Sequence, residues 1–148
     1  MAIPALQNDG FLPEGIHDCT IEEAQAMFGV FQGCDRRPQL WIKLREFLLE
    51  VKACALVGAV LLDGSFVSGK TDPNDIDLIL VVPAAHDFFA DLSPTEYNVL
   101  AKRRVFRRYG FDVLVARAES EEYRRYAAFF QQVRLEPNRR KGMLRLSL

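Results

Sequence analysis

The order of apolar and polar positions predicts two helices in the first third of the chain. Residues 1–19 carry scattered prolines and glycines and are expected to form an irregular lead-in. A capping box beginning at Thr20 starts a short helix that Gly29 can stop. After a connector over residues 30–37, Pro38 can occupy the first turn of a longer helix. The apolar stripe of this helix consists of Leu40, Trp41, Leu44, Leu48 and Val51.

Two continuous apolar runs in the middle of the chain predict buried strands. The first run covers residues 57–62. A loop with a short turn is expected over residues 64–74. The second strand is expected over residues 75–82, because Pro83 then ends it.

The last third of the chain predicts two helices and two further strands. A capping box over residues 93–96, with proline in the favoured first position, starts a helix that runs to about Tyr109 and closes at Gly110. Phe111 begins a strand that extends to residue 116. Ser120 can cap the last helix, which is expected to end before Pro137 and whose apolar stripe contains Tyr123, Tyr126, Phe130 and Val133.

Residues 143–148 alternate between apolar and polar and predict a last, half-exposed strand. Because strands and helices interleave, the predicted fold class is α+β (α/β), a small mixed sheet flanked by helices. A length of 148 residues suits one domain. We expect this domain to comprise a lead-in and helices over 1–56, a core over 57–116, and a C-terminal helix and strand over 117–148.

Composition excludes several classes of protein. The apolar content of 49% is sufficient for a packed core. The longest central apolar run, residues 53–62, is too short to cross a bilayer, and no targeting segment is recognisable, so we expect a cytoplasmic protein without membrane contact. Three cysteines without Cys-x-x-Cys spacing indicate reduced thiols rather than a disulfide scaffold or a zinc site: Cys19, Cys34 and Cys54.

Charge is unevenly distributed, although the net charge is only −1. Residues 1–100 hold 6 basic and 15 acidic side chains, whereas residues 101–148 hold 13 basic and 5 acidic ones. A basic half beside an acidic site suits the binding of triphosphate or RNA. Alternatively, the two halves neutralise each other across the fold.

The candidate chemistry lies between the two central strands. Asp75 and Asp77 would project from the same face of the strand predicted over 75–82, where two buried carboxylates repel each other. A hard cation relieves that repulsion, and Mg²⁺ prefers oxygen ligands and keeps phosphates in its coordination shell. Gly64 and Ser65 lie just upstream, and glycine allows the backbone to approach a phosphate closely. The combination predicts a site for a metal-bound nucleoside triphosphate.

This spacing resembles that of the nucleotidyltransferase superfamily, which has the polymerase-beta-like fold. The family pattern is an apolar strand, Gly-Ser, about ten residues, Asp-x-Asp and a third carboxylate on a later strand. Here Gly64-Ser65 and Asp75-Ile76-Asp77 match the first parts, and Asp112 fits the third acid by position. The chain is also similar to a compact bacterial family of minimal nucleotidyltransferase-like proteins of unknown function, through residues 12–20, 62–67, 74–78 and 141–142.

The resemblance implies transfer of a nucleoside monophosphate from a nucleoside triphosphate to a hydroxyl, with release of pyrophosphate. Asp75, Asp77 and Asp112 would be the catalytic residues and the ligands of two Mg²⁺ ions about 3.5–4 Å apart. Gly64 and Ser65 would hold the β- and γ-phosphates, and Lys70 in the same loop would contact the triphosphate. The acceptor would be an RNA 3′ end, a protein side chain or a small molecule. Small relatives of this fold often belong to toxin–antitoxin or defence pairs, which implies a protein partner or a homodimer.

Each candidate residue also has a purely structural interpretation. Asp75 suits turn chemistry, Asp77 a surface position on an edge strand, and Ser65 a helix N-cap. Asp112 suits an edge-strand acid paired with an arginine, and Lys70 an ordinary exposed loop lysine. The helix over 93–109 carries five cations that would bind triphosphate, RNA or an acidic partner, or form a solvated face paired with acids elsewhere: Lys102, Arg103, Arg104, Arg107 and Arg108. Two further readings of the whole chain remain: a non-catalytic module that binds nucleotide or a partner, and an RNA-binding accessory protein.

Overall fold

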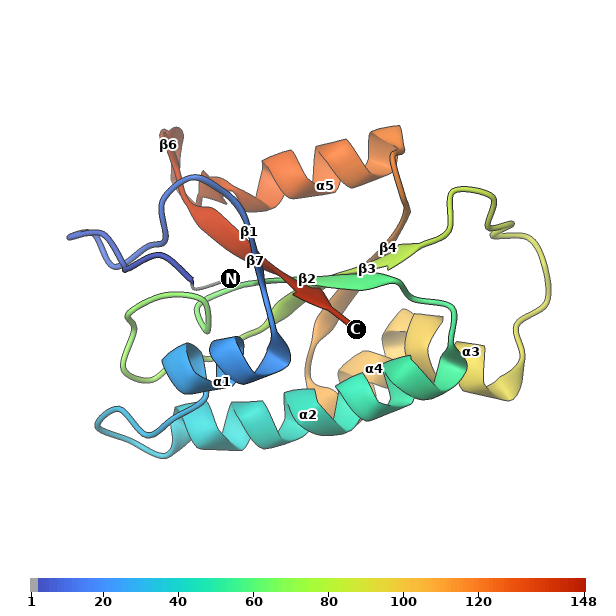
Figure 1. The fold of residues 1–148 in the computed structure, drawn as a ribbon, viewed down its shortest axis with the longest axis horizontal. Coiled ribbons are helices and arrows are strands. Elements are labelled where there is room, and N and C mark those ends of the chain that lie inside the picture. The colour runs from blue at the N-terminus through green and yellow to red at the C-terminus, as the bar shows by residue number, and fades with distance from the viewer. Residues whose placement is uncertain (1–2) are drawn as a thin grey trace.

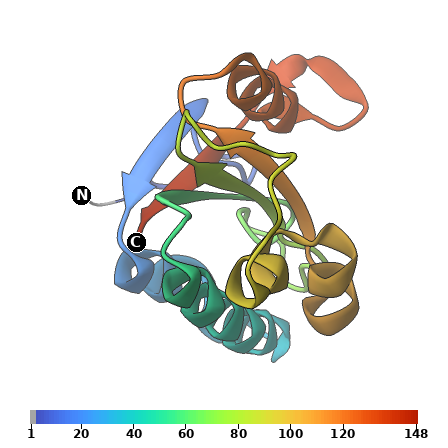
Figure 2. The same ribbon diagram turned by 90° about the vertical axis from the view of Figure 1, so that its right-hand side faces the viewer.

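The structure is a computed structural model, and it describes residues 3–148. Five strands form one mixed sheet in the order β1-β7-β2-β3-β4. Helices α1 to α4 cover one face of this sheet and α5 covers the other (Figures 1 and 2). The predicted α+β class, a small mixed sheet flanked by helices, is therefore confirmed.

The strands of the main sheet are β1 (Gly15–Cys19), β2 (Ala59–Asp63), β3 (Asp77–Val82), β4 (Asp112–Arg117) and β7 (Gly142–Ser147). The helices are α1 (Ile21–Phe28), α2 (Arg36–Cys54), α3 (Pro94–Leu100), α4 (Lys102–Tyr109) and α5 (Glu121–Phe130). A separate hairpin consists of β5 (Gln132–Val133) and β6 (Glu136–Arg140). Within residues 3–148, none of the helices combines the length and apolar character that a bilayer-spanning segment needs.

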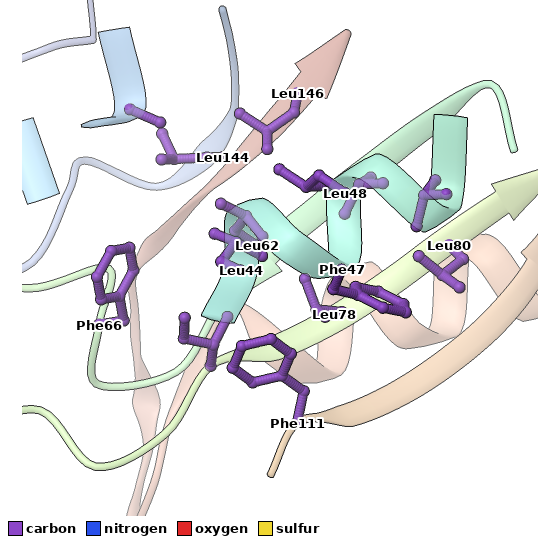
Figure 3. Packing of buried hydrophobic residues seen from close by; sticks show 14 of the residues in the cluster. Leu44, Phe47, Leu48, Leu62, Phe66, Leu78, Leu80, Phe111, Leu144 and Leu146 are labelled. Carbon is purple, nitrogen blue, oxygen red and sulfur yellow. The ribbon is translucent and has the colours of Figure 1, made fainter. Parts of the chain in front are cut away.

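The main core lies between α2 and the sheet (Figure 3). Leu44, Phe47 and Leu48 of α2 are buried against strand residues that include Leu62, Leu78, Leu80, Leu144 and Leu146. Strand side chains alternate between the two faces of a sheet. Their neighbours in sequence therefore pack on the opposite face, under α5: Leu61, Ile79 and Met143.

The helix ends that depend on local chemistry form as predicted. The Thr20 hydroxyl accepts a hydrogen bond from the Glu23 amide at 3.0 Å, and the Ser93 hydroxyl accepts one from the Glu96 amide at 3.3 Å. Gly110, at φ 81°, ends α4 in the left-handed conformation that glycine adopts readily. These signals act within a few residues, so tertiary packing does not override them.

One predicted helix is two helices. The segment expected to run unbroken to Tyr109 is interrupted at Ala101, whose ψ of 100° is extended. The break opens carbonyl groups at the end of α3, and the Arg104 guanidinium donates to one of them, Asn98 O, at 2.6 Å. Because of this break, Val99 on α3 and Val105 on α4 are both buried in the core.

The predicted lead-in and last strand need correction together. Residues 15–19 are not irregular but form β1, which runs parallel to β7 with Gly15 opposite Gly142. Because β1 covers its outer edge, β7 is an inner strand, and Met143, Leu144 and Leu146 are fully buried rather than half-exposed. Pairing between the two ends of the chain leaves no local signal in the sequence.

The last helix is shorter than predicted. It ends at Phe130, and the following residues form the β5–β6 hairpin, so Val133 lies in β5 and not on a helical stripe. Pro137 lies within β6 instead of ending a helix. Proline is compatible with this position because β6 pairs with only one neighbouring strand.

Candidate functional site

Three aspartates form a row at one end of the neighbouring strands β2, β3 and β4. Asp63 ends β2 and lies opposite Asp77, the first residue of β3, and Asp77 lies opposite Asp112, the first residue of β4. Residues paired across neighbouring strands point to the same face of a sheet. That face is the α5 side, since Leu61 and Ile79, two residues along, pack there. Asp77 and Asp112, distant in the chain, are thus brought together.

The turn after β2 packs directly on the segment that carries the acids. Gly64 has φ 90°, a conformation that favours glycine. A Cβ atom at this position would lie only 2.8 Å from the carbonyl oxygen of Asp75 and 3.1 Å from the amide nitrogen of Asp77. The Phe66 amide donates to the same Asp75 carbonyl at 3.2 Å. Glycine at this turn therefore sets the position of both aspartates.

Ser65 holds the side chain of Asp75. Oδ1 of Asp75 accepts hydrogen bonds from the Ser65 amide, at 3.1 Å, and from the Ser65 hydroxyl. The hydroxyl in turn accepts from the amide of Asn74 at 3.0 Å. The predicted strand over 75–82 begins only at Asp77, so strand alternation does not orient Asp75. The Ser65 bonds orient it instead, and a carboxylate occupies the donors that were assigned to phosphate.

Like charges and burial raise the pKa of two acids in the row. The pKa of Asp77 rises to about 6, first because the side chain is largely desolvated and then because Asp75 and Asp112 are negatively charged nearby. Burial raises the pKa of Asp63 to about 7, although Lys141 opposes that shift. Folding therefore concentrates acidic groups where β2 ends and β3 begins, and there protonation or a cation would relieve the repulsion.

Lys141 is the cation of the site that sequence reasoning did not single out. Its Nζ lies 3.2 Å from Oδ2 of Asp63, and Asp63 is buried, with only 2% of the residue exposed. Lys141 immediately precedes β7, so only the pairing of β7 with β2 brings it to Asp63. The Lys141-Gly142 pair that carried part of the resemblance was the available signal.

Arg37 fixes the loop between the Gly64–Ser65 turn and the pair of acids Asp75 and Asp77. Its side chain is completely buried within α2, although residues 30–37 were predicted to be a connector. The guanidinium donates to the carbonyl oxygens of Phe66 at 2.7 Å, Ser68 at 2.6 Å and Lys70 at 2.6 Å, and also to Phe28 at 3.2 Å. Three carbonyls of one loop on one planar group fix the path of the backbone from Ser65 to Lys70.

A cleft of about 1230 Å³ opens over these residues. Its polar side carries Asp75 and Asp77, the Gly64–Ser65 turn and the two lysines, Lys70 and Lys141. The end of α5 and the β5–β6 hairpin supply most of its apolar lining, with Phe129, Phe130, Val133 and Leu135, beside the polar residues Gln132, Arg134 and Glu136. Carboxylates and lysines on one side and an apolar wall on the other suit a ligand with a charged and a flat apolar part.

Asp112 lies at the edge of this arrangement. It does not line the large cleft but a smaller hollow of about 450 Å³ on the side of α4. The arginine pairing suggested as its structural role is absent among residues 3–148. Asp77, its partner in register, lines the large cleft, so the two hollows are lined by acids on neighbouring strands.

The carboxylates of the site have the chemistry that a hard cation needs, but their oxygens do not face a common point. Carboxylate oxygens are the ligands that Mg²⁺ prefers, and the pKa of Asp77 is raised first by burial and then by the negative charges of Asp75 and Asp112, which a cation would neutralise. Within the described part of the chain, however, no three carboxylate, histidine or cysteine side chains are grouped so as to hold one ion. Binding would require the carboxylates of Asp75, Asp77 and Asp112 to turn toward a common point.

Comparison with known proteins identifies the family but not the activity. No curated protein matches this chain, and no solved structure matches it. One protein family matches residues 4–147, which is almost the whole sequence. The chain therefore belongs to a family of unknown function (DUF6932).

Proposed function

We propose that the protein is a Mg²⁺-dependent nucleotidyltransferase that moves a nucleoside monophosphate from a nucleoside triphosphate to a hydroxyl acceptor. The observation that carries the proposal is the packing of the Gly64–Ser65 turn against Asp75 and Asp77, with Asp112 opposite Asp77. A glycine turn, a pair of aspartates and a third acid on the next strand fit the pattern that the sequence resembles. We place the protein in the cytoplasm, where both nucleoside triphosphates and Mg²⁺ are available.

Each residue of the site has a role in this proposal. Asp75, Asp77 and Asp112 would hold the metal ions, which neutralise charge on the phosphates and lower the pKa of the attacking hydroxyl when bound. Lys70 and Lys141 would contact the triphosphate from the polar side of the cleft. The apolar wall that contains Phe130 and Leu135 would receive the base.

The transfer step is a substitution at the α-phosphorus. The acceptor oxygen forms a bond to that phosphorus while the bond from it to the oxygen bridging the β-phosphate breaks. The bridging oxygen keeps the electron pair and leaves as part of pyrophosphate. The hydroxyl proton passes to the carboxylate of Asp112, which lies nearest the open edge of the sheet.

Calorimetry and a pyrophosphate assay test the proposal together. We expect Mg²⁺ with one of the four nucleoside triphosphates to bind the protein, and binding to be lost when Asp75→Ala and Asp77→Ala are combined. The matched control is Asp72→Ala with Asp87→Ala, two exposed acids outside the cleft. Pyrophosphate release in the presence of an acceptor is the second expected result. Binding that is equal in both double variants would contradict the proposal.

A second candidate is a module of the same fold that binds nucleotide or a protein partner without turnover. The specific observation in its favour is that the amide and hydroxyl of Ser65 already donate hydrogen bonds to the carboxylate of Asp75 rather than being free for a phosphate. An antitoxin-like or toxin-like partner, or a second copy, would then occupy the cleft. Nucleotide binding without pyrophosphate release from any acceptor would favour this candidate.

A further inference from the structure

Two of the five cations on α4 are paired and three are not. Glu50 of α2 accepts a hydrogen bond from Arg104 at 2.7 Å and lies 3.7 Å from Arg108, as the structural interpretation of this helix expects. No ion pair or hydrogen bond of the side chains of Lys102, Arg103 and Arg107 occurs within residues 3–148. Arg103 and Arg107 are four residues apart on one helix face and repel each other. The exposed side of α4 is therefore a concentration of uncompensated positive charge.

An aromatic ring lies among these charges. Phe106 follows Arg103 by one turn, and 57% of its surface is exposed. Its ring stacks on no other ring of the described residues. Single exposed apolar residues are ordinary on protein surfaces. An exposed ring flanked by unpaired cations, however, is the combination with which proteins bind single-stranded nucleic acid, because bases stack on the ring while cations follow the phosphates.

The position of this surface connects it to the acids. Lys102, Arg103, Phe106 and Arg107 line the hollow of about 450 Å³ together with Asp112. Figure 2 shows α4 beside the β4 edge of the sheet, and β4 begins at Asp112. Asp112 lies opposite Asp77, which lines the large cleft on the other side. A ligand bound along α4 would thus end beside Asp112, one strand away from the acid that lines the large cleft.

We propose that the exposed face of α4, formed by Lys102, Arg103, Phe106 and Arg107, binds the 3′ end of single-stranded RNA. The terminal hydroxyl would lie at Asp112, across from the nucleotide in the large cleft. The eight residues of α4 extend over only about 12 Å, which suits the last few nucleotides rather than a long tract. The acceptor role rests on the proposed function, whereas RNA binding by this face does not.

Fluorescence anisotropy with an end-labelled single-stranded RNA of about ten nucleotides tests the binding directly. The measurement is made in chelator without nucleotide, so that the metal site does not contribute. Arg103→Ala with Arg107→Ala should weaken binding at least about ten-fold and lower the salt slope by about 1.4, since each phosphate contact to a single strand contributes about 0.7. Phe106→Ala should weaken it at least about five-fold through lost stacking.

The control is Arg124→Ala with Arg125→Ala on α5, which removes the same charge from a helix on the opposite face of the sheet. These residues are exposed, as are Arg103 and Arg107, so neither double variant disturbs the core. Equal weakening by the control pair would overturn the inference, because binding would then reflect net charge alone. Absence of RNA binding at low salt would overturn it as well.

The failure of this inference is distinguishable from the failure of the proposed function. The Arg103→Ala and Arg107→Ala variant should bind Mg²⁺ and nucleoside triphosphate as the parent does, and should lose transfer to RNA. Labelled nucleotide that enters protein but not RNA would overturn the RNA assignment and leave the transferase standing. RNA binding on α4 without any nucleotide binding would contradict the transferase and leave the α4 site standing.

Discussion

Asp77 and Asp112 lie directly opposite each other at the start of two parallel strands, β3 and β4. Adjacent strands are about 4.8 Å apart, so two carboxylates on the same face are close enough to repel. Nothing in the packing of the strands requires acids here, because the next residue on each strand, Leu78 and Val113, is apolar and buried. A locally unfavourable pair of charges at the mouth of a cleft is the kind of conflict that a binding site explains.

The first prediction concerns the cost of that conflict. Asp77→Asn removes one of the repelling charges and keeps the shape of the side chain. We expect the free energy of unfolding at neutral pH to rise by about 1 kcal/mol, which already discounts the pKa shift for the partial exposure of Asp77. Urea denaturation measures it, with the exposed Asp72→Asn as the control. A loss of stability in Asp77→Asn would show that the carboxylate makes a favourable contact.

The same shifts predict how stability depends on pH. The folded protein binds protons at Asp77 and Asp63 with pKa values of about 6 and 7, above the ordinary value of 3.8. Between about pH 4 and pH 7 the folded state therefore holds more protons than the unfolded chain, and these two groups make stability fall as the pH rises. In Asp77→Asn this fall should be smaller, as denaturation at a series of pH values would reveal. An unchanged profile would contradict the assignment to Asp77.

A second prediction concerns the turn that places the acids. Gly64→Ala puts a Cβ atom 2.8 Å from the Asp75 carbonyl in a backbone conformation that costs about 1–2 kcal/mol for residues other than glycine. We expect a loss of at least about 2 kcal/mol in unfolding free energy and a displaced Asp75. Gly58→Ala is the matched control, because a Cβ there meets nothing within 4 Å. Equal stability of the two variants would mean that the turn adapts freely.

The features that sequence alone predicted are those whose causes are local or repeated. Capping boxes at Thr20 and Ser93 act within one helical turn, and the apolar runs around Leu61 and Ile79 make buried strands wherever they pair. The break at Ala101 has no proline or glycine to mark it. The strand at Gly15 exists because a partner from the other end of the chain lies beside it. Such pairings are properties of the whole fold.

Arg37 gives a third prediction. Replacement by methionine keeps an unbranched stem but leaves four carbonyl oxygens without their donor in a buried place. A buried carbonyl oxygen that loses its donor costs about 1–3 kcal/mol, so we expect the loss over these carbonyls to exceed about 3 kcal/mol and the loop after Ser65 to become accessible to protease. Arg45→Met on the exposed side of the same helix should change stability by less than about 0.5 kcal/mol. Similar losses in both variants would deny Arg37 its anchoring role.

The salt bridge between Lys141 and Asp63 gives a fourth prediction. Lys141→Met should destabilise the protein more at about pH 8.5 than at about pH 5, because Asp63 is ionised only above its pKa of about 7 and then lacks its counterion. Thermal denaturation at the two pH values measures the difference. Arg140→Met, an exposed neighbour, is the control and should show no such dependence. A loss of stability that is the same at both pH values would contradict the pairing.

The candidate site was predictable as a set of acids but not as a set of contacts. Asp75, Asp77 and Asp112 were found from spacing and resemblance, and the register of β3 and β4 places two of them together. Asp75 was expected to be oriented by a strand, whereas Ser65 orients it. Lys141 follows Arg139 and Arg140 in the sequence, and no local pattern sets it apart from them. What distinguishes Lys141 is its salt bridge to the buried carboxylate of Asp63.

The most direct test of the account is transfer of label from the α-phosphate. The protein is incubated with Mg²⁺, total cell RNA and protein, and each of the four nucleoside triphosphates in turn, with Asp77→Asn as the folded but inactive comparison. We predict that label from at least one nucleotide enters an acceptor with the parent protein and not with the variant. Absence of label from all four nucleotides, or equal labelling by Asp77→Asn, would contradict catalysis by these acids.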